Sequence, residues 1–223
     1  MLVVFHFIMK GAHKMKKNTR LYVWGRGRHE DEKLAFGADP DVLLHDYDAY
    51  VKFVKGIEHA VRKDDRYTHY VGKIRLAGFN HCAVLGHAAD NMDKVELEMH
   101  HGPIFNLFDI CDIVLKHCIK KGDIENLTTF DVADIVLTEH EKDHIQVVML
   151  TQTAHKAAHK SNMFLDARAS VGRIDKFIDK FADGMEDDHW DKISRYLDRC
   201  KKYDGTLDKG LFDTAERLTE YKK

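Results

Sequence analysis

Apolar residues recur at helical spacing through most of this chain of 223 residues, and that periodicity constrains its fold more than any other feature. In residues 40–63, PDVLLHDYDAYVKFVKGIEHAVRK, the apolar positions are Val42, Leu43, Tyr47, Tyr50, Val51, Val54, Ile57 and Val61. Side chains three or four residues apart share one face of a helix, so this segment predicts one or two helices with a buried face.

The same spacing predicts further helices at residues 104–121, 128–143, 152–161, 171–185, 188–203 and 209–223. The first of them ends at Gly122 and carries lysines in its last turn, where the helix dipole favours cations. Thr128 or Thr129 is expected to begin the second as an N-cap, and Thr151 the third, because a threonine hydroxyl accepts from the free amides of a first turn.

Four short runs are typical of strands, at residues 19–28, 73–79, 94–99 and 145–150. The predicted fold class is therefore α+β, mainly helical. With two prolines and no low-complexity linker or repeat, we expect one core domain with additions. The expected parts are a basic N-terminal segment (residues 1–30), the α+β core domain (31–165) and a C-terminal extension of amphipathic helices (166–223).

The composition is that of an ordinary globular protein, with 44% hydrophobic and 32% charged residues. No apolar run approaches the roughly 20 residues that span a bilayer, so no membrane association is expected. The four cysteines form neither a C-x-x-C pair nor a disulfide framework, which favours a reducing, cytoplasmic setting.

Basic residues concentrate near the N-terminus although the formal net charge is −2. Between Lys10 and Arg28 there are seven basic residues and no acidic one. Such a segment contacts phosphates through charge alone, although a solvated tail has the same composition. The candidates for nucleic-acid contact here are Lys16, Lys17, Arg20, Arg26 and Arg28.

Two histidine motifs stand out among the 16 histidines. His155 and His159 are separated by one helical turn, so both imidazoles project from one face and can share a metal ion. His100 and His101 close a strand, and strand alternation points them in opposite directions. One of the two can therefore act as a third metal ligand while the other faces a different environment.

These motifs resemble the HNH nucleases, also called His-Me finger or ββα-metal nucleases. The resemblance is carried by LEMHHGP at residues 97–103 and QVVMLTQTAHKAAH at residues 146–159. It is closest to the nuclease colicins, which combine His-His with a downstream His-x-x-x-His. It covers about residues 80–162 and implies a small ββα-metal core, interrupted here by inserted helices near 104–121 and 128–141.

The resemblance implies a role for each of the four histidines. His101 corresponds to the general base that activates water, and His100, His155 and His159 correspond to the ligands of one divalent ion. This ligand set is compatible to differing degrees with Mg, Mn, Ni or Zn. The implied activity is metal-dependent endonuclease cleavage of phosphodiester bonds, with DNA as the expected substrate.

One position departs from the family pattern. Where the family has an asparagine that orients the base, this chain has Gln146, and His144 lies two residues earlier as a substitute. Lys156 and Lys160, on the same helix as the histidine pair, are candidates for contacts to flanking phosphates. Compact nucleases of this kind are frequent in bacteriophages, so the resemblance also implies a phage origin and the cytoplasm of a bacterial host.

Two other functions remain open at this point. The histidines are also compatible with a non-catalytic protein that binds a metal or serves as a structural or interaction partner. In addition, LLHDYD at residues 43–48 offers a His45–Asp46 pair like that of another class of metal-dependent phosphohydrolase.

Overall fold

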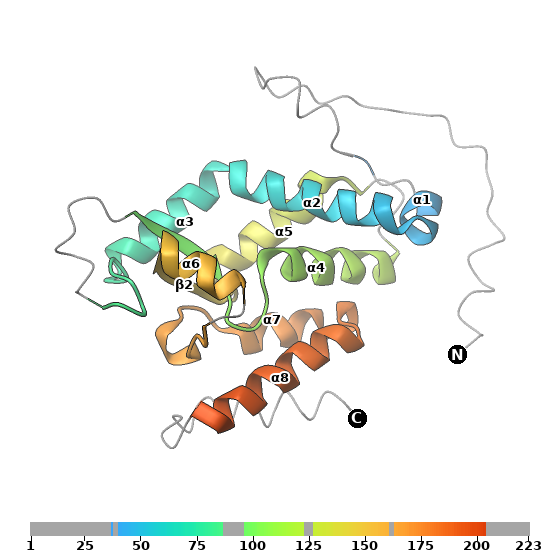
Figure 1. The fold of residues 1–223 in the computed structure, drawn as a ribbon. Helices are drawn as coiled ribbons and strands as arrows, with labels where there is room; N and C mark the ends of the chain where they lie inside the picture. Colours follow the sequence, from blue (N-terminus) through green and yellow to red (C-terminus); the bar gives the residue numbers. More distant parts are fainter. Residues whose placement is uncertain (1–36, 38–39, 87–95, 123–126, 161–162, 204–223) are drawn as a thin grey trace. The chain divides into compact units, whose positions relative to one another are not determined.

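The computed structural model describes residues 37, 40–86, 96–122, 127–160 and 163–203, all within one compact unit that spans residues 34–223. Its helices and strands follow in the order α1 (Pro40–His45), α2 (Tyr47–Lys63), α3 (Asp65–Leu76), β1 (Leu97–His101), α4 (Leu107–Lys121), α5 (Thr129–Glu141), β2 (Val147–Thr151), α6 (Gln152–His159), α7 (Ile174–Phe181) and α8 (Asp187–Tyr203). Short 3₁₀ turns lie at Ala167–Ala169 and Ala182–Gly184. The α+β, mainly helical class is confirmed (Figure 1).

The helix boundaries follow the end signals of the sequence. Thr128 caps α5 through a hydrogen bond from the Asp131 amide, and Asp131 accepts in return from the Thr128 amide. Thr151 caps α6, and Gly122 ends α4 in the left-handed conformation at φ 85°. These three predictions are confirmed. Each cap satisfies backbone groups that a helix end otherwise leaves without partners.

One predicted strand is wrong. Residues 73–79 were expected to be a strand, but residues 73–76 form the last turn of α3. Tyr70 and Ile74, one helical turn apart, are the buried residues of this helix, whereas Leu76 is 91% exposed. Helical pairing with Tyr70 therefore outweighs the local alternation of Ile74 and Leu76. The expected strand at 19–28 and helix at 209–223 lie outside the described residues.

The main core lies between the helices α2, α4, α5 and α7. Its fully buried side chains include Phe53 of α2, Ile110 of α4, Val136 of α5 and Phe177 of α7. Because α7 contributes to this core, the described part of the C-terminal helical segment packs with the preceding helices. No helix in the described ranges is long and apolar enough to cross a membrane.

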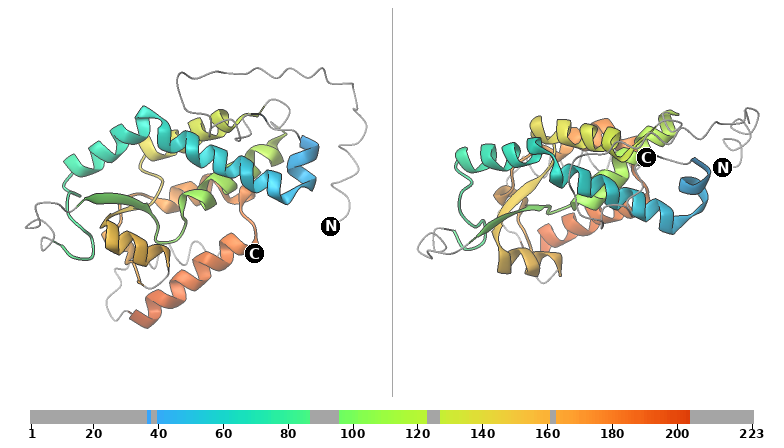
Figure 2. Two further views of the ribbon diagram at one scale, coloured as in Figure 1. Left: turned by 45° about the horizontal axis from the view of Figure 1, so that its top comes forward. Right: turned by 90° about the horizontal axis from the view of Figure 1, so that it is seen from above.

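The two strands form a small antiparallel sheet in which His100 pairs with Val148 and His101 with Val147. Alternation divides β2 between two apolar clusters. Val147 and Met149 belong to the main core, whereas Val148 and Leu150 pack with Ala154 of α6 in a second, smaller cluster. Figure 2 shows α6 against this strand pair.

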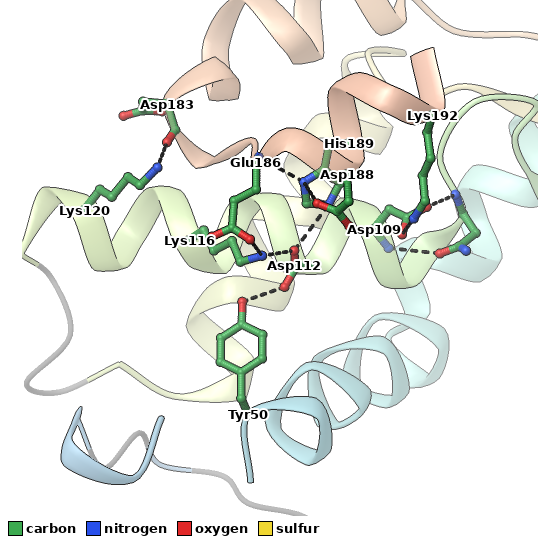
Figure 3. A network of polar contacts seen from close by, with 11 residues as sticks. Tyr50, Asp109, Asp112, Lys116, Lys120, Asp183, Glu186, Asp188, His189 and Lys192 are labelled. Carbon is green, nitrogen blue, oxygen red and sulfur yellow. Dashed lines mark hydrogen bonds and ion pairs between the residues drawn. The ribbon is translucent and has the colours of Figure 1, made fainter. Parts of the chain in front are cut away.

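A polar network fastens α4 to the helices on either side of it (Figure 3). Asp112 of α4 is 5% exposed and accepts a hydrogen bond of 2.6 Å from the Tyr50 hydroxyl of α2. It also accepts one of 2.8 Å from Lys116 and lies 3.2 Å from Nε2 of His189 on α8. The Glu186 amide donates to Nδ1 of His189, which leaves the His189 proton on Nε2, facing Asp112.

Candidate metal centre

Three histidines meet where β1 faces α6. His100 comes from β1, and His155 and His159 come from successive turns of α6. One ring nitrogen of each lies within 4.8 Å of those of the other two. The position of α6 follows from Thr151, which is both the last residue of β2 and the N-cap of the helix, so no linker separates strand from helix.

The distances are close to those of a metal site. Nε2 of His155 and Nε2 of His159 lie 3.0 Å apart, and the ring centroids of His100 lie 5.0 and 4.9 Å from theirs. Two nitrogens bound at the usual Zn–N length to a tetrahedral ion lie about 3.3 Å apart. Small side-chain rotations would therefore bring the three nitrogens to ligand distance.

A carboxylate behind the cluster fixes the orientation of one ligand. Glu98, two residues before His100 on β1, accepts a hydrogen bond from Nδ1–H of His155. That bond leaves the lone pair on Nε2 of His155, on the side of His159. Carboxylate–histidine–metal arrangements of this kind are typical of metal sites, where they set the tautomer and raise ligand basicity.

His100 is the buried member of the cluster. Its Nδ1 has no hydrogen-bond partner within the described parts of the chain, so a bound metal is one way to satisfy the ring. Burial, together with His155 and His159, lowers the pKa of His100 to about 4. The ring is therefore neutral at physiological pH, which is the state that binds metals.

A pocket of about 200 Å³ opens beside the histidines. His155 and His159 are both part of its lining, so the side of the cluster that faces the pocket is accessible. Glu58 and Arg62 of α2 contribute the charged groups of the lining. Three protein ligands and one accessible side are the arrangement in which a metal ion takes a fourth ligand from outside the set.

His101 points away from this cluster, as strand alternation predicts. It is 4% exposed, and its Nε2 lies 2.9 Å from Nε2 of His140 on α5. His140 donates from Nδ1 to the Val136 carbonyl at 2.8 Å, so its Nε2 accepts the proton of His101. Tyr67 stacks against the His101 ring at 6.0 Å. His101 is thus a hydrogen-bonded part of the helical core that also reaches the pocket lining.

Neither residue expected to orient His101 has a hydrogen bond to its ring among the described contacts. His144 bonds from Nδ1 to the buried Glu139 at 2.7 Å, and Gln146 donates from Nε2 to Ser170 at 2.7 Å. The partner of His101 is His140 instead, which the sequence analysis missed. Its one signal was its place four residues after Val136, on the buried face of α5.

The buried pair predicts a loss of stability in mild acid. Burial is the main cause that lowers the pKa of His140 to about 4, against an ordinary value of about 6.5, and burial lowers the pKa of His101 well below that value. Between pH 6.5 and pH 4, these histidines bind protons in the unfolded chain but not in the native chain. The stability of the native state therefore falls as the pH decreases below 6.5.

In urea unfolding with EDTA present, we expect the free energy of unfolding of the wild type to be lower at pH 5 than at pH 7.5. Proton binding at His140 in the unfolded chain alone should account for about 2 kcal/mol of this difference. His69→Gln, at an exposed position on α3, should leave the dependence of the unfolding free energy on pH unchanged, whereas His140→Leu should make this dependence weaker. A flat profile in the wild type would contradict this interpretation.

The other candidate residues are not part of the histidine cluster itself. Lys156 and Lys160 are exposed on α6 and at its C-terminal end, and their contact with DNA remains a prediction. Lys16, Lys17, Arg20, Arg26 and Arg28 lie outside the described residues. His45 is exposed at the end of α1, and Asp46 is the N-cap of α2, so this pair has a local structural role.

Comparison with known proteins decides between the candidate functions. A family model described as "Bacteriophage G278-like virion protein" matches residues 26–223, whereas no curated protein and no solved structure matches the chain. The match confirms the expected phage origin. It also shows that the expected endonuclease function is wrong, because it indicates a component of the phage particle. Since the match covers well over half of its length, the chain belongs to the bacteriophage G278-like virion protein family.

Proposed function

We propose that the protein is a structural component of the phage particle in which His100, His155 and His159 bind one transition-metal ion. The family supplies the virion role. The convergence of three ring nitrogens within 4.8 Å is the observation that supports the metal. Bound there, the ion joins β1 to α6 and stabilises the small sheet against its helix.

The donor set favours zinc among the candidate ions. Three imidazole nitrogens suit Zn²⁺, Ni²⁺ or Co²⁺, whereas Mg²⁺ binds oxygen ligands and keeps several waters. The orientation of His155 supports the same choice, because its hydrogen bond to Glu98 leaves the lone pair of Nε2 available to a tetrahedral ion. Zinc has no redox chemistry and tolerates the geometry that the protein supplies, which fits a stabilising role.

Two measurements test the two parts of this proposal. Mass spectrometry of purified phage particles should detect the protein at a stoichiometry that is constant between preparations and resists a high-salt wash. Absence from the particles would contradict the virion role. Elemental analysis of the purified full chain should find one zinc per chain. In a zinc titration, Glu98→Gln should bind the ion with an affinity about 10- to 100-fold lower than the wild type.

His159→Ala should lower the zinc content toward zero, whereas His69→Ala, at an exposed position on α3, should retain it. Equal zinc contents in these two variants would contradict the assigned ligands.

A further inference from the structure

The pocket beside the histidine cluster holds charged, polar and apolar groups in a specific combination. Arg62 and Glu58 come from α2, Leu107 and Phe108 from the start of α4, and His155 and His159 of the histidine cluster also line the pocket. We propose that this pocket binds a carboxylate, with one oxygen as the fourth ligand of the metal and the other on the Arg62 guanidinium. This inference rests on the proposed metal site.

The need for a fourth ligand follows from coordination chemistry. Structural zinc sites are almost always closed by four ligands. The cluster within the described residues supplies three, His100, His155 and His159, all of them neutral imidazoles. A divalent ion held by three neutral ligands keeps its full charge, so an anion is the ligand that such a site attracts most strongly.

Arg62 supplies the second point of recognition. Its Nη2 lies 3.8 Å from Oε1 of Glu58, which is within ion-pair range but beyond hydrogen-bond length. This contact therefore does not occupy the two parallel N–H groups with which a guanidinium binds a carboxylate. Half of the Arg62 side chain is exposed, so the group can turn toward a ligand at small cost.

Glu58 selects the charge of the ligand. Its carboxylate lines the same pocket, so it repels a doubly charged anion more strongly than a singly charged one. A phosphate group carries close to two charges at neutral pH, whereas a carboxylate carries one. The single charge and the planar shape of a carboxylate thus fit Glu58 and Arg62 together.

The remaining lining accommodates what is attached to the carboxylate. Met99, Leu107 and Phe108 offer apolar surface to a short aliphatic stem. The side-chain oxygen of Asn106 is engaged with the Asp109 amide at 2.9 Å, which leaves its amide nitrogen as a donor. Both a free small carboxylate and an acidic side chain of a polypeptide have this chemistry.

Cobalt-loaded full-length protein provides the test, because the visible absorption of Co²⁺ reports its fourth ligand. We expect sodium acetate, and a glutamate blocked at both backbone ends, to change the spectrum in a saturable way. Arg62→Gln should weaken this binding on the order of 10-fold, the usual value of a charge-assisted hydrogen bond. Lys63→Gln, the next residue on α2 and outside the pocket lining, should leave it unchanged.

Each other outcome has a defined meaning. Tighter binding of the blocked glutamate than of acetate identifies a polypeptide as the source, and the reverse identifies a small molecule. A spectrum that ignores both carboxylates, or that responds more strongly to inorganic phosphate, overturns the carboxylate site while leaving the metal in place. A protein that binds no Co²⁺ overturns the metal site itself, and the carboxylate site with it.

Discussion

Zinc is expected to raise the midpoint of thermal unfolding of the metal-free protein by about 5–10 °C. A ligand present at one hundred times its dissociation constant stabilises the native state by about 2.7 kcal/mol, and each kcal/mol moves the midpoint of a domain of this size by about 2–4 °C. The increase arises because the unfolded chain does not hold His100 of β1 near His155 and His159 of α6.

Scanning calorimetry with EDTA, and then with zinc, measures this shift. His159→Ala should remove the zinc response and change the midpoint in EDTA little, because this residue is exposed at the end of α6. His69→Ala, also exposed, should respond to zinc as the wild type does. A zinc response that survives in His159→Ala would show that the ion binds elsewhere.

Asp112→Ala is expected to destabilise the protein by about 3–5 kcal/mol, the cost of removing one member of a buried ion-pair network. Burial alone would raise the pKa of Asp112, but hydrogen bonds from His189, Lys116 and Tyr50 outweigh it and the pKa is lowered. The carboxylate therefore stabilises the native state above its ordinary pKa, and this contribution is lost as the pH falls toward the lowered value.

Urea unfolding at pH 7.5 and at pH 3.5 measures both effects. The difference between Asp112→Ala and the wild type should be smaller at pH 3.5 than at pH 7.5, because the contribution of the carboxylate begins to be lost once the pH is below the ordinary aspartate pKa of 3.8. The matched control is Asp198→Ala on α8, where the aspartate is 74% exposed and pairs with Lys201. This change should lie within about 0.5 kcal/mol of the wild type. A cost for Asp112→Ala below about 1 kcal/mol at pH 7.5 would contradict the role of the network in joining α2, α4 and α8.

Local signals account for what the sequence predicts well. The caps Thr128, Thr151 and Gly122 act within one helical turn, and their effect does not depend on the rest of the fold. The opposite directions of His100 and His101 follow from strand geometry alone, and the structure confirms them in the two different environments of these rings.

Pairings between distant segments account for what the sequence did not predict. His140 meets His101 across 39 positions, and His144 turns to Glu139, which is also held by Lys180 from 41 positions away. No local pattern encodes the contact of His101 with His140 or that of Glu139 with Lys180, since they depend on how α5 packs against β1 and α7. The functional class was missed for a related reason, because a set of metal ligands does not specify the use to which a protein puts the metal.

The length of chain between the two strands determines when during folding the proposed metal centre can form. Residues 102–146 separate β1 from β2 and contain α4 and α5, both of which contribute to the main core. His100 can approach α6 only after this long segment has been closed, which makes the contact late on entropic grounds. In a short zinc module, ligands close in sequence let the ion start folding; at the metal centre proposed here, an ion would bind only after the segment that carries α4 and α5 has folded back.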